Sequence, residues 1–486
     1  MAIRFGLNGS RIDTDLPPST TVLDALREHF YLTGTKEGCA EGDCGACTIA
    51  LGRPDGEGGV RWEAANSCLM LLAQIDGALV KTVEGLAGPD GLHRVQSVLA
   101  ESDGTQCGFC TPGFVMSMYV LDRAGGPKDE ADIHEALSGN LCRCTGYRPI
   151  VEACRTLSAP SGAGNVDANE GATLVVPDAV KGETAPDLTI HEAGGQRFLV
   201  PRTLEALARA KAANPEAVLL AGATDLGLNP SKRRVPLTNA ILTTSVAELN
   251  VVERRGDHLV IGAGATYAQA LPALEAHFPA FGALVRRIGS RQIRAMGTLG
   301  GNLGTASPVG DTLPPLLALD ADVVLSAWDG TGVSSRTLKV EDFILGYRKT
   351  ALSPGEFIAE IRIPLLKPGE TFHAYKLSRR FDQDISILLG AFRLRLEEGR
   401  VAALAAAFGG MADRPVRARH IEAHLRGRPW DAAALDGVEE VLARDVSPLS
   451  DHRAGAAYRL QAAANLLRRL AFETAAPDVP VRLEAL

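Results

Sequence analysis

Three features are absent from this sequence or scarce in it. No cysteine follows Cys154, so two-thirds of the chain has none. No apolar run approaches the roughly 20 residues of a membrane span, and the longest weakly polar tract, 402–410, is far shorter. Basic residues are not in excess, since 50 Lys and Arg stand against 58 Asp and Glu, for a net charge of −8. We therefore expect neither a membrane nor nucleic acid as a partner.

The first residues, Met1-Ala2-Ile3-Arg4-Phe5, contain no apolar stretch of the kind found in a secretory signal. We therefore expect a cytoplasmic protein whose cysteines stay reduced rather than forming disulfides. The composition, 46% apolar and 22% charged, is ordinary for a globular protein. At about 150 residues per domain, 486 residues suggest about three domains.

Eight of the nine cysteines fall into two spaced quartets. The first quartet has the C-x4-C-x2-C…C spacing typical of four thiolates around a plant-type [2Fe–2S] cluster. Its members are Cys39, Cys44, Cys47 and Cys68. Glycines and small residues separate the first three, which lets the backbone wrap closely and point N–H groups at sulfur. This long loop favours an iron–sulfur cluster over a zinc site.

The second quartet consists of a C-x2-C pair and a C-x-C pair 31 residues further on. Its members are Cys107, Cys110, Cys142 and Cys144. Paired cysteines of this kind also make tetrahedral zinc sites, so zinc remains an alternative here. Cys154 is left over, and we interpret it as a buried, inert thiol. Two iron–sulfur quartets would make the first third of the chain an electron carrier.

The pattern of apolar residues changes along the chain. Residues 1–75 are predicted to be β-rich, with a strand at 3–7, a turn at Asn8-Gly9 and a short helix capped by Thr21. Residues 76–156 are predicted to be helical, with Leu92 and Val95 on one apolar face and Pro112 at a helix start. Residues 157–192 lack periodicity and read as a linker. The remainder is predicted to be α/β, with a helix starting near Pro201 and a buried strand at 217–221.

Two segments rich in small residues, 222–226 and 297–308, lie in that second half. Glycines at strand ends allow close approach to phosphate, and free N–H groups and hydroxyls supply donors. Each segment alone is consistent with a tight turn, whereas the two together favour a dinucleotide cofactor. Gly262-Ala263-Gly264 lacks the third glycine of a Rossmann fingerprint and is discounted.

The chain resembles the iron–sulfur/flavin subunits of bacterial xanthine dehydrogenases, which are members of the molybdenum hydroxylase family. The resemblance is carried by the sequences at 37–47, 106–113 and 139–150, which contain the cysteines, and by the segments around Gly222, Gly301 and 375–380. It implies an α+β multidomain fold. The implied parts are a β-grasp ferredoxin domain (1–75), an α-helical [2Fe–2S] bundle (76–156), the linker (157–192), a two-subdomain FAD-binding domain of the vanillyl-alcohol oxidase type (193–368) and a C-terminal α+β domain (369–486).

The resemblance also implies two [2Fe–2S] clusters on the two quartets, an FAD, and a pterin contact at Gln106. No residue of this chain is expected to hydroxylate substrate. The FAD-contacting positions it implies are Leu219, Leu220, Ala221, Gly222, Ala223, Thr224, Asp225, Leu226, Ile288, Thr298, Asn302, Asp311, Ile358 and Lys376. Ile288 stands where animal members carry an aromatic residue. Two interpretations of a charged segment stay open, that of Arg379, Arg380 and Asp382. The resemblance implies that it lies near the nicotinamide and flavin-tuning region, whereas its charge alone is equally typical of a solvated turn.

The function implied is an oxidoreductase in which electrons from hypoxanthine or xanthine oxidation to urate pass through the clusters to FAD and then to NAD+. Apart from the Gln106 contact, no molybdenum-binding region is expected in this sequence, so a separate molybdopterin subunit is expected, in an α2β2 heterotetramer. Three alternatives stay open: a sister molybdenum hydroxylase acting on aldehydes, carbon monoxide or acyl-thioesters, a stand-alone NADH-dependent reductase, and a non-catalytic metal-binding sensor.

Overall fold

The computed structural model describes residues 1–54, 59–89, 91–158 and 186–475. These residues form two compact units. The first unit contains Met1–Val246 together with Gly289–Gly297, and the second contains Ala247–Ile288 and Thr298–Leu486. The short segment Gly289–Gly297, here called the returning segment, therefore belongs to the first unit although its neighbours in sequence belong to the second.

A mixed five-stranded sheet opens the first unit, with strand order β2-β1-β5-β3-β4. Only the β1–β5 pair is parallel, the arrangement of a β-grasp fold. Asn8 and Gly9 both have positive φ, as a tight turn between β1 and β2 requires. The Thr21 side chain caps the following helix by accepting from the Asp24 N–H, so the predicted hairpin and cap are confirmed. The elements are β1 (Ile3–Leu7), β2 (Ser10–Thr14), α1 (Val22–Asp24), η1 (Ala25–His29), β3 (Thr48–Pro54), β4 (Val60–Asn66), η2 (Leu72–Ile75), β5 (Leu79–Lys81) and η3 (Val83–Gly85).

The next segment is helical, as predicted. The central helix α3 begins with Pro112 near its start and is buried along most of its length. The prediction for Leu92 is wrong: the His93 side chain caps α2, so the helix begins after Leu92, which is exposed. The helices are α2 (Arg94–Glu101), α3 (Thr111–Arg123), α4 (Glu130–Leu137) and α5 (Arg148–Arg155), followed by η4 (Thr156–Ser158).

A four-stranded sheet of order β6-β7-β9-β8 completes the first unit. Its buried side chains pack with Leu71 and Ala73 of the ferredoxin-like part. Most of the predicted linker lies outside the described residues, but β6 begins inside it. The helix expected near Pro201 begins later, behind the capping side chain of Thr203. The elements are β6 (Leu188–Ala193), β7 (Gln196–Pro201), α7 (Leu204–Ala213), β8 (Val218–Leu220), α8 (Leu228–Ser231), β9 (Asn239–Leu242) and, from the returning segment, α11 (Arg291–Arg294).

The second unit begins with an antiparallel sheet of order β10-β11-β16-β12-β13. Helices cover it around one large apolar core. The strands are β10 (Val252–Arg255), β11 (His258–Gly262), β12 (Asp322–Trp328), β13 (Val333–Lys339) and β16 (Phe357–Pro364), with the small pair β14 (Ile344–Gly346) and β15 (Lys349–Thr350). The helices are η5 (Ala247–Leu249), α9 (Tyr267–His277), α10 (Pro279–Arg286), α12 (Leu299–Thr305), α13 (Leu313–Ala318) and α14 (Val340–Phe343).

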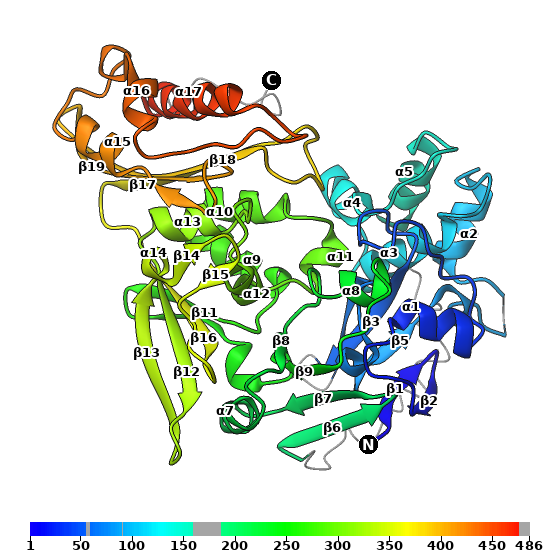
Figure 1. Cartoon of the computed structure of the whole chain (residues 1–486). Helices are drawn as coiled ribbons and strands as arrows, with labels where there is room; N and C mark the ends of the chain where they lie inside the picture. Colours follow the sequence, from blue (N-terminus) through cyan, green and yellow to red (C-terminus); the bar gives the residue numbers. More distant parts are fainter. Residues whose placement is uncertain (55–58, 90, 159–185, 476–486) are drawn as a thin grey trace. The chain divides into compact units, whose positions relative to one another are not determined.

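The C-terminal part is a second antiparallel sheet, β17-β18-β19-β20, with its own core. The long helix α17, red in Figure 1, packs on this sheet. The elements are β17 (Glu370–Leu377), β18 (Leu388–Glu397), β19 (Arg400–Gly409), β20 (Val416–Arg417), α15 (Arg419–Leu425), η6 (Ala433–Leu435), α16 (Val438–Leu442) and α17 (Ala456–Ala475). None of the helices in the described ranges is both long and apolar enough to cross a membrane.

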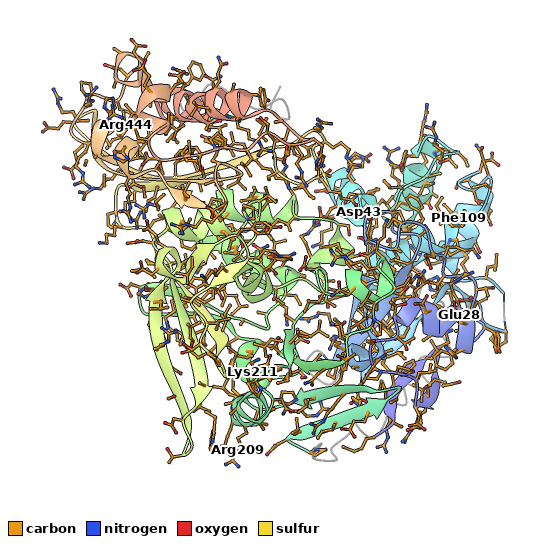
Figure 2. The ribbon with its side chains drawn as sticks, viewed as in Figure 1. Glu28, Asp43, Phe109, Arg209, Lys211 and Arg444 are labelled. Carbon is orange, nitrogen blue, oxygen red and sulfur yellow. The ribbon has the colours of Figure 1, made fainter. Side chains whose placement is uncertain are left out.

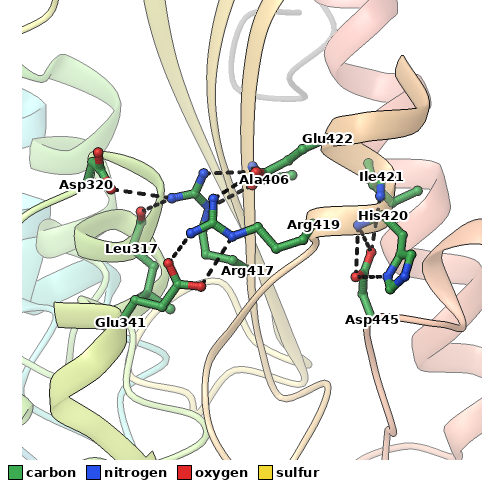
Figure 3. A network of polar contacts seen from close by, with 10 residues as sticks. All are labelled: Leu317, Asp320, Glu341, Ala406, Arg417, Arg419, His420, Ile421, Glu422 and Asp445. Carbon is green, nitrogen blue, oxygen red and sulfur yellow. Dashed lines mark hydrogen bonds and ion pairs between the residues drawn. The ribbon is translucent and has the colours of Figure 1, made fainter. Parts of the chain in front are cut away.

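A buried polar network ties this sheet to the rest of the second unit (Figure 3). Arg417 donates to both carboxylate oxygens of Glu422 and to the backbone oxygen of Leu317 in α13. The same carboxylate accepts from the Ala406 N–H of β19. Because Arg417 and Glu422 are both buried, this pair fixes α15 against the sheet.

Candidate iron–sulfur and flavin sites

The first cysteine quartet lies in the first unit, on the loop before β3 and just after β4. The Sγ atoms of Cys47 and Cys68 are 3.3 Å apart. The Sγ atom of Cys39 accepts hydrogen bonds from the N–H groups of Glu41 at 3.4 Å and Asp43 at 3.3 Å. A hydrogen bond from the Cys44 thiol lowers the pKa of Cys39 to about 5, and the same bond raises the pKa of Cys44. The quartet is thus two neighbouring pairs of thiols.

The loop geometry depends on its glycines. A Cβ atom at Gly38 would lie 2.7 Å from the Cys44 Sγ. Gly42 has a φ of +85°, a conformation that side chains with a Cβ rarely adopt. The cradle that the sequence predicts is therefore present, with N–H groups directed at sulfur.

The second quartet lies at the start of α3 and after α4. Cys110 is the residue that precedes the first turn of α3. The Cys107 thiol is hydrogen-bonded to Cys144, and the Cys110 thiol to Cys142. The Cys142 N–H donates to the Tyr147 hydroxyl at 3.0 Å. These four thiols also form two pairs.

The second quartet is the more accessible of the two. Cys107 and Cys144 are exposed, whereas Cys47 and Cys68 are buried. Phe109, labelled in Figure 2, is 48% exposed beside Cys107, although a ring of this size is usually covered. Gln106, the predicted pterin contact, is exposed on the same loop.

This pairing suits a cluster with two metal ions. A tetrahedral zinc ion would need four ligands directed at a single point. Two thiol pairs side by side match the demand of a [2Fe–2S] cluster, whose four thiolates are shared between two irons. The residues of both quartets therefore fit that cluster.

The predicted flavin residues divide between the two units. The set in the first unit follows β8. Gly222 lies so close to the backbone of the returning segment that a Cβ there would be 1.8 Å from the Met296 oxygen. The next residue, Ala223, has a φ of +61°. The Gln74 side chain donates to the Ala221 oxygen at 3.0 Å. The strand thus ends in a tightly held turn, as a phosphate-binding segment requires.

The set in the second unit surrounds α12. The Thr298 hydroxyl caps this helix by accepting from the Gly301 N–H at 2.8 Å. Asn302 accepts a hydrogen bond from the Thr312 hydroxyl at 2.6 Å. Ile358, on β16, is 8% exposed. A Cβ at Gly304 would lie 3.6 Å from Ile358, so α12 and β16 are close neighbours here.

A buried ion pair completes that set. The Lys376 Nζ lies 2.7 Å from Asp311 Oδ2 and 3.0 Å from the Arg287 oxygen. Asp311 Oδ1 accepts from the Ser386 hydroxyl at 2.5 Å. Arg287, which precedes Ile288, places its guanidinium 4.3 Å from the centre of the Phe381 ring. The structure therefore brings together Asp311, Lys376 and the backbone beside Ile288.

Sequence reasoning missed two residues of these sites. Ser386 is 75 positions from Asp311, and no local signal marks it. Gln292 joins the loops that carry the two quartets, and only the folded contacts identify it. Arg379 and Arg380 donate backbone N–H groups to the Asp384 carboxylate, so these two predicted residues lie on an ordered turn.

Four family models match the chain. A 2Fe-2S iron-sulfur cluster binding domain covers residues 5–73, and a [2Fe-2S] binding domain covers residues 82–155. The FAD binding domain in molybdopterin dehydrogenase covers residues 193–366. The CO dehydrogenase flavoprotein C-terminal domain covers residues 373–474.

Curated relatives match nearly the whole chain. The xanthine dehydrogenase of Emericella nidulans is 34% identical, over 91% of this chain and 36% of its own length. The xanthine dehydrogenase/oxidase of Gallus gallus is 31% identical, over 91% of this chain and 38% of its own. The chain therefore spans little more than a third of the length of these relatives.

Solved structures match a smaller part of the chain. The Cu,Mo-CO dehydrogenase in its cyanide-inactivated form has a TM-score of 0.52 and 26% identity, covering 56% of this chain and 94% of that one. Quinoline 2-oxidoreductase from Pseudomonas putida 86 has a TM-score of 0.51 and 24% identity, covering 56% of this chain and 94% of that one, and supports the fold alone.

Proposed function

The chain belongs to the molybdenum hydroxylase family as its iron–sulfur and FAD part, and from this premise we propose that it carries the electrons of a xanthine dehydrogenase. Electrons released when hypoxanthine or xanthine is oxidised at a molybdopterin cofactor enter this chain and leave it on NAD+. The eight cysteines of the two quartets hold [2Fe–2S] clusters. The residues at 219–226, with Ile288, Thr298, Asn302, Asp311, Ile358 and Lys376, hold FAD.

One observation carries the proposal: two quartets of paired thiols share a polypeptide with the buried Lys376–Asp311 pair of a flavin domain. A flavin, when bound, exchanges two electrons with nicotinamide and single electrons with iron–sulfur clusters. The chain's own residues hold these groups, orient them and limit their contact with water. The curated relatives that match across both halves support the purine substrate.

The molybdopterin cofactor is proposed to reside on a partner subunit, in an α2β2 assembly. We propose that Gln106 and Phe109, both exposed beside the second quartet, contact that partner. The assembly is proposed to be cytoplasmic.

A second candidate is the equivalent part of a carbon monoxide or aldehyde oxidising enzyme. The likeness to solved CO dehydrogenase chains supports it, since those chains match across more than half of this one. In this second candidate the two [2Fe–2S] clusters and the FAD have the same role, and the partner subunit oxidises a different substrate.

The test is co-purification followed by an assay. Affinity-tagged chain should bring down a larger molybdenum-containing chain, and the complex should reduce NAD+ when given xanthine. The isolated chain, loaded with FAD, should pass electrons from NADH to a dye but leave hypoxanthine untouched. Turnover of carbon monoxide or aldehyde in place of xanthine would favour the second candidate. Hypoxanthine oxidation by the isolated chain would contradict the proposal that substrate is oxidised on a partner subunit.

A further inference from the structure

The side-chain amide of Gln292 is hydrogen-bonded to both cysteine-bearing loops. Gln292, on α11 of the returning segment, is fully buried. Its Nε2 donates to the Asn140 Oδ1 at 3.1 Å, the Thr48 Oγ1 at 3.1 Å and the Ser117 Oγ at 3.3 Å. These three acceptors belong to three separate parts of the first unit: the residues just before Cys142, strand β3 just after Cys47, and helix α3 behind Cys110.

The acceptors are themselves bonded across the gap between the loops. Asn140 Nδ2 donates to the Gly45 oxygen at 3.0 Å, and Gly45 lies next to Cys44 in the first quartet. The N–H of Leu141 donates to the Cys44 oxygen at 2.9 Å, and Leu141 lies next to Cys142 in the second. Asn140 Nδ2 also donates to the Thr48 Oγ1 at 3.3 Å, and Thr48 follows Cys47. Three hydrogen bonds therefore join a ligand loop of one quartet to a ligand loop of the other, and the Gln292 amide is bonded to Asn140, which makes two of them.

The packing around the amide leaves no room for adjustment. A Cβ at Gly139 would lie 1.9 Å from the Gln292 Oε1, and a Cβ at Gly45 would lie 2.2 Å from the Gly139 oxygen. A Cβ at Gly113 would lie 2.3 Å from the Gly45 oxygen. Three glycines are thus required for the loops, α3 and the amide to meet.

The same amide carries an energetic cost. Among the described residues, the Gln292 Oε1 is buried without a hydrogen-bond partner, and a buried acceptor in that state destabilises the fold. An apolar side chain of equal size would avoid this cost. The donor end of Gln292 therefore has a role that an apolar residue could not fill.

A second contact holds the segment from its other end. The guanidinium of Arg294 is buried, forms an ion pair with Glu135 of α4 and donates to the Gly289 oxygen at 2.9 Å. Helix α4 leads directly to Asn140. The returning segment thus contacts the residues that precede Cys142 at two points, Glu135 and Asn140.

We infer that Gln292 is a positioning residue that fixes the two cysteine loops against each other and so sets the separation and electronic coupling of the groups they hold. This inference rests on the proposed function, because it requires two clusters. In physical terms, loss of the amide donor removes one hydrogen bond each from the Asn140 and Thr48 oxygens, which keep those from Ser117 and Asn140. The link between α11 and the two loops is then weaker, and the loops are less firmly fixed.

The test uses the full-length chain with both clusters in place. Gln292→Met keeps the length of the side chain and removes the donor. Each protein is fully reduced with dithionite and examined by low-temperature electron paramagnetic resonance. Two paramagnetic clusters split each other's signals, and the splitting falls steeply with their separation. We expect the variant to keep both signals and to lose or narrow the splitting.

Gln96→Met is the matched control. Gln96 likewise forms more than one hydrogen bond through its amide, accepting from the His93 N–H and donating to the Val83 oxygen, but neither bond involves a cysteine-bearing loop. It should keep the splitting of the unmodified chain despite a comparable loss of hydrogen bonds.

The outcomes are distinguishable. An unchanged splitting in Gln292→Met with both clusters present would overturn the inference and leave the proposed function standing. Absence of two clusters from the unmodified chain would instead overturn the proposed function. Should Gln292→Met fail to fold, Gln292→Glu, which keeps the shape of the side chain, is measured by the same criterion.

Discussion

The ammonium group of Lys376 lies 2.7 Å from the carboxylate of Asp311, with the two side chains only 1% and 9% exposed. Buried charges of this kind are costly unless each has its partner. Asp311 is also held by Ser386, and Lys376 by the Arg287 oxygen, so the pair joins three segments of the second unit.

Lys376→Met should destabilise the chain and release flavin. Removing one partner leaves the Asp311 charge buried and unpaired, which costs about 3–5 kcal/mol. Chemical denaturation and the flavin absorbance per chain measure the two effects. Lys339→Met is the control, because the two side chains of its pair with Asp322 are 45% and 20% exposed, and ion pairs that water reaches contribute about 0–1 kcal/mol. Equal losses in the two variants would contradict this explanation.

Cys44→Ala should remove one of the two reduced-cluster signals and about half of the bound iron, since each cluster holds half of it. The thiol of Cys44 is paired with that of Cys39, so its loss leaves one iron with a single protein ligand. Iron analysis and electron paramagnetic resonance provide the measurement. Cys154→Ala is the control because Cys154, on α5, is a buried thiol that belongs to neither quartet. Two intact signals in Cys44→Ala would show that the ligand assignment is wrong.

Gly222→Ala should disturb the turn after β8. Its new Cβ would meet the Met296 oxygen at 1.8 Å, and backbone atoms cannot move aside as a flexible side chain can. Overpacking of this kind costs about 1–3 kcal/mol. Gly332→Ala adds the same methyl group in open space and should be neutral. Thermal unfolding and FAD affinity of the two variants give the comparison, and equal behaviour would contradict the steric argument.

Glu422→Ala should lower the free energy of unfolding by about 3–5 kcal/mol. The substitution removes the carboxylate that accepts hydrogen bonds from the buried guanidinium of Arg417 and from the Ala406 N–H. Glu341→Ala is a suitable control, since its pair with Arg419 is exposed. Urea unfolding followed by circular dichroism gives both values. A small effect for Glu422 would show that water reaches the pair.

Local signals predicted local structure well. The Asn8-Gly9 turn and the Thr21 cap depend on residues within a few positions of each other, and both are confirmed. Leu92 was misplaced because its helix starts at a histidine cap, which ranks below Ser, Thr, Asp and Asn as a signal. The spacing of the cysteines indicated the two quartets but not which thiols are paired.

Contacts between distant residues were beyond the reach of the sequence. Gln292 and Asn140 are 152 positions apart, and Ser386 and Asp311 are 75 apart. Nothing in the composition around any of them indicates its partner. Such pairs depend on tertiary packing, which local propensity does not encode.

The excursion of Gly289–Gly297 into the first unit has a consequence for dissection of the protein. A fragment that stops at Val246 would contain every cysteine yet lack the side chains of Gln292, Ile293 and Met296, which fill its interior. Conversely, a proteolytic nick at one of the three places where the backbone passes between units would leave two covalent tethers uncut. The cysteine-bearing part of the chain is thus not a detachable module. Any engineered version of it would have to include the nine residues of Gly289–Gly297 as well.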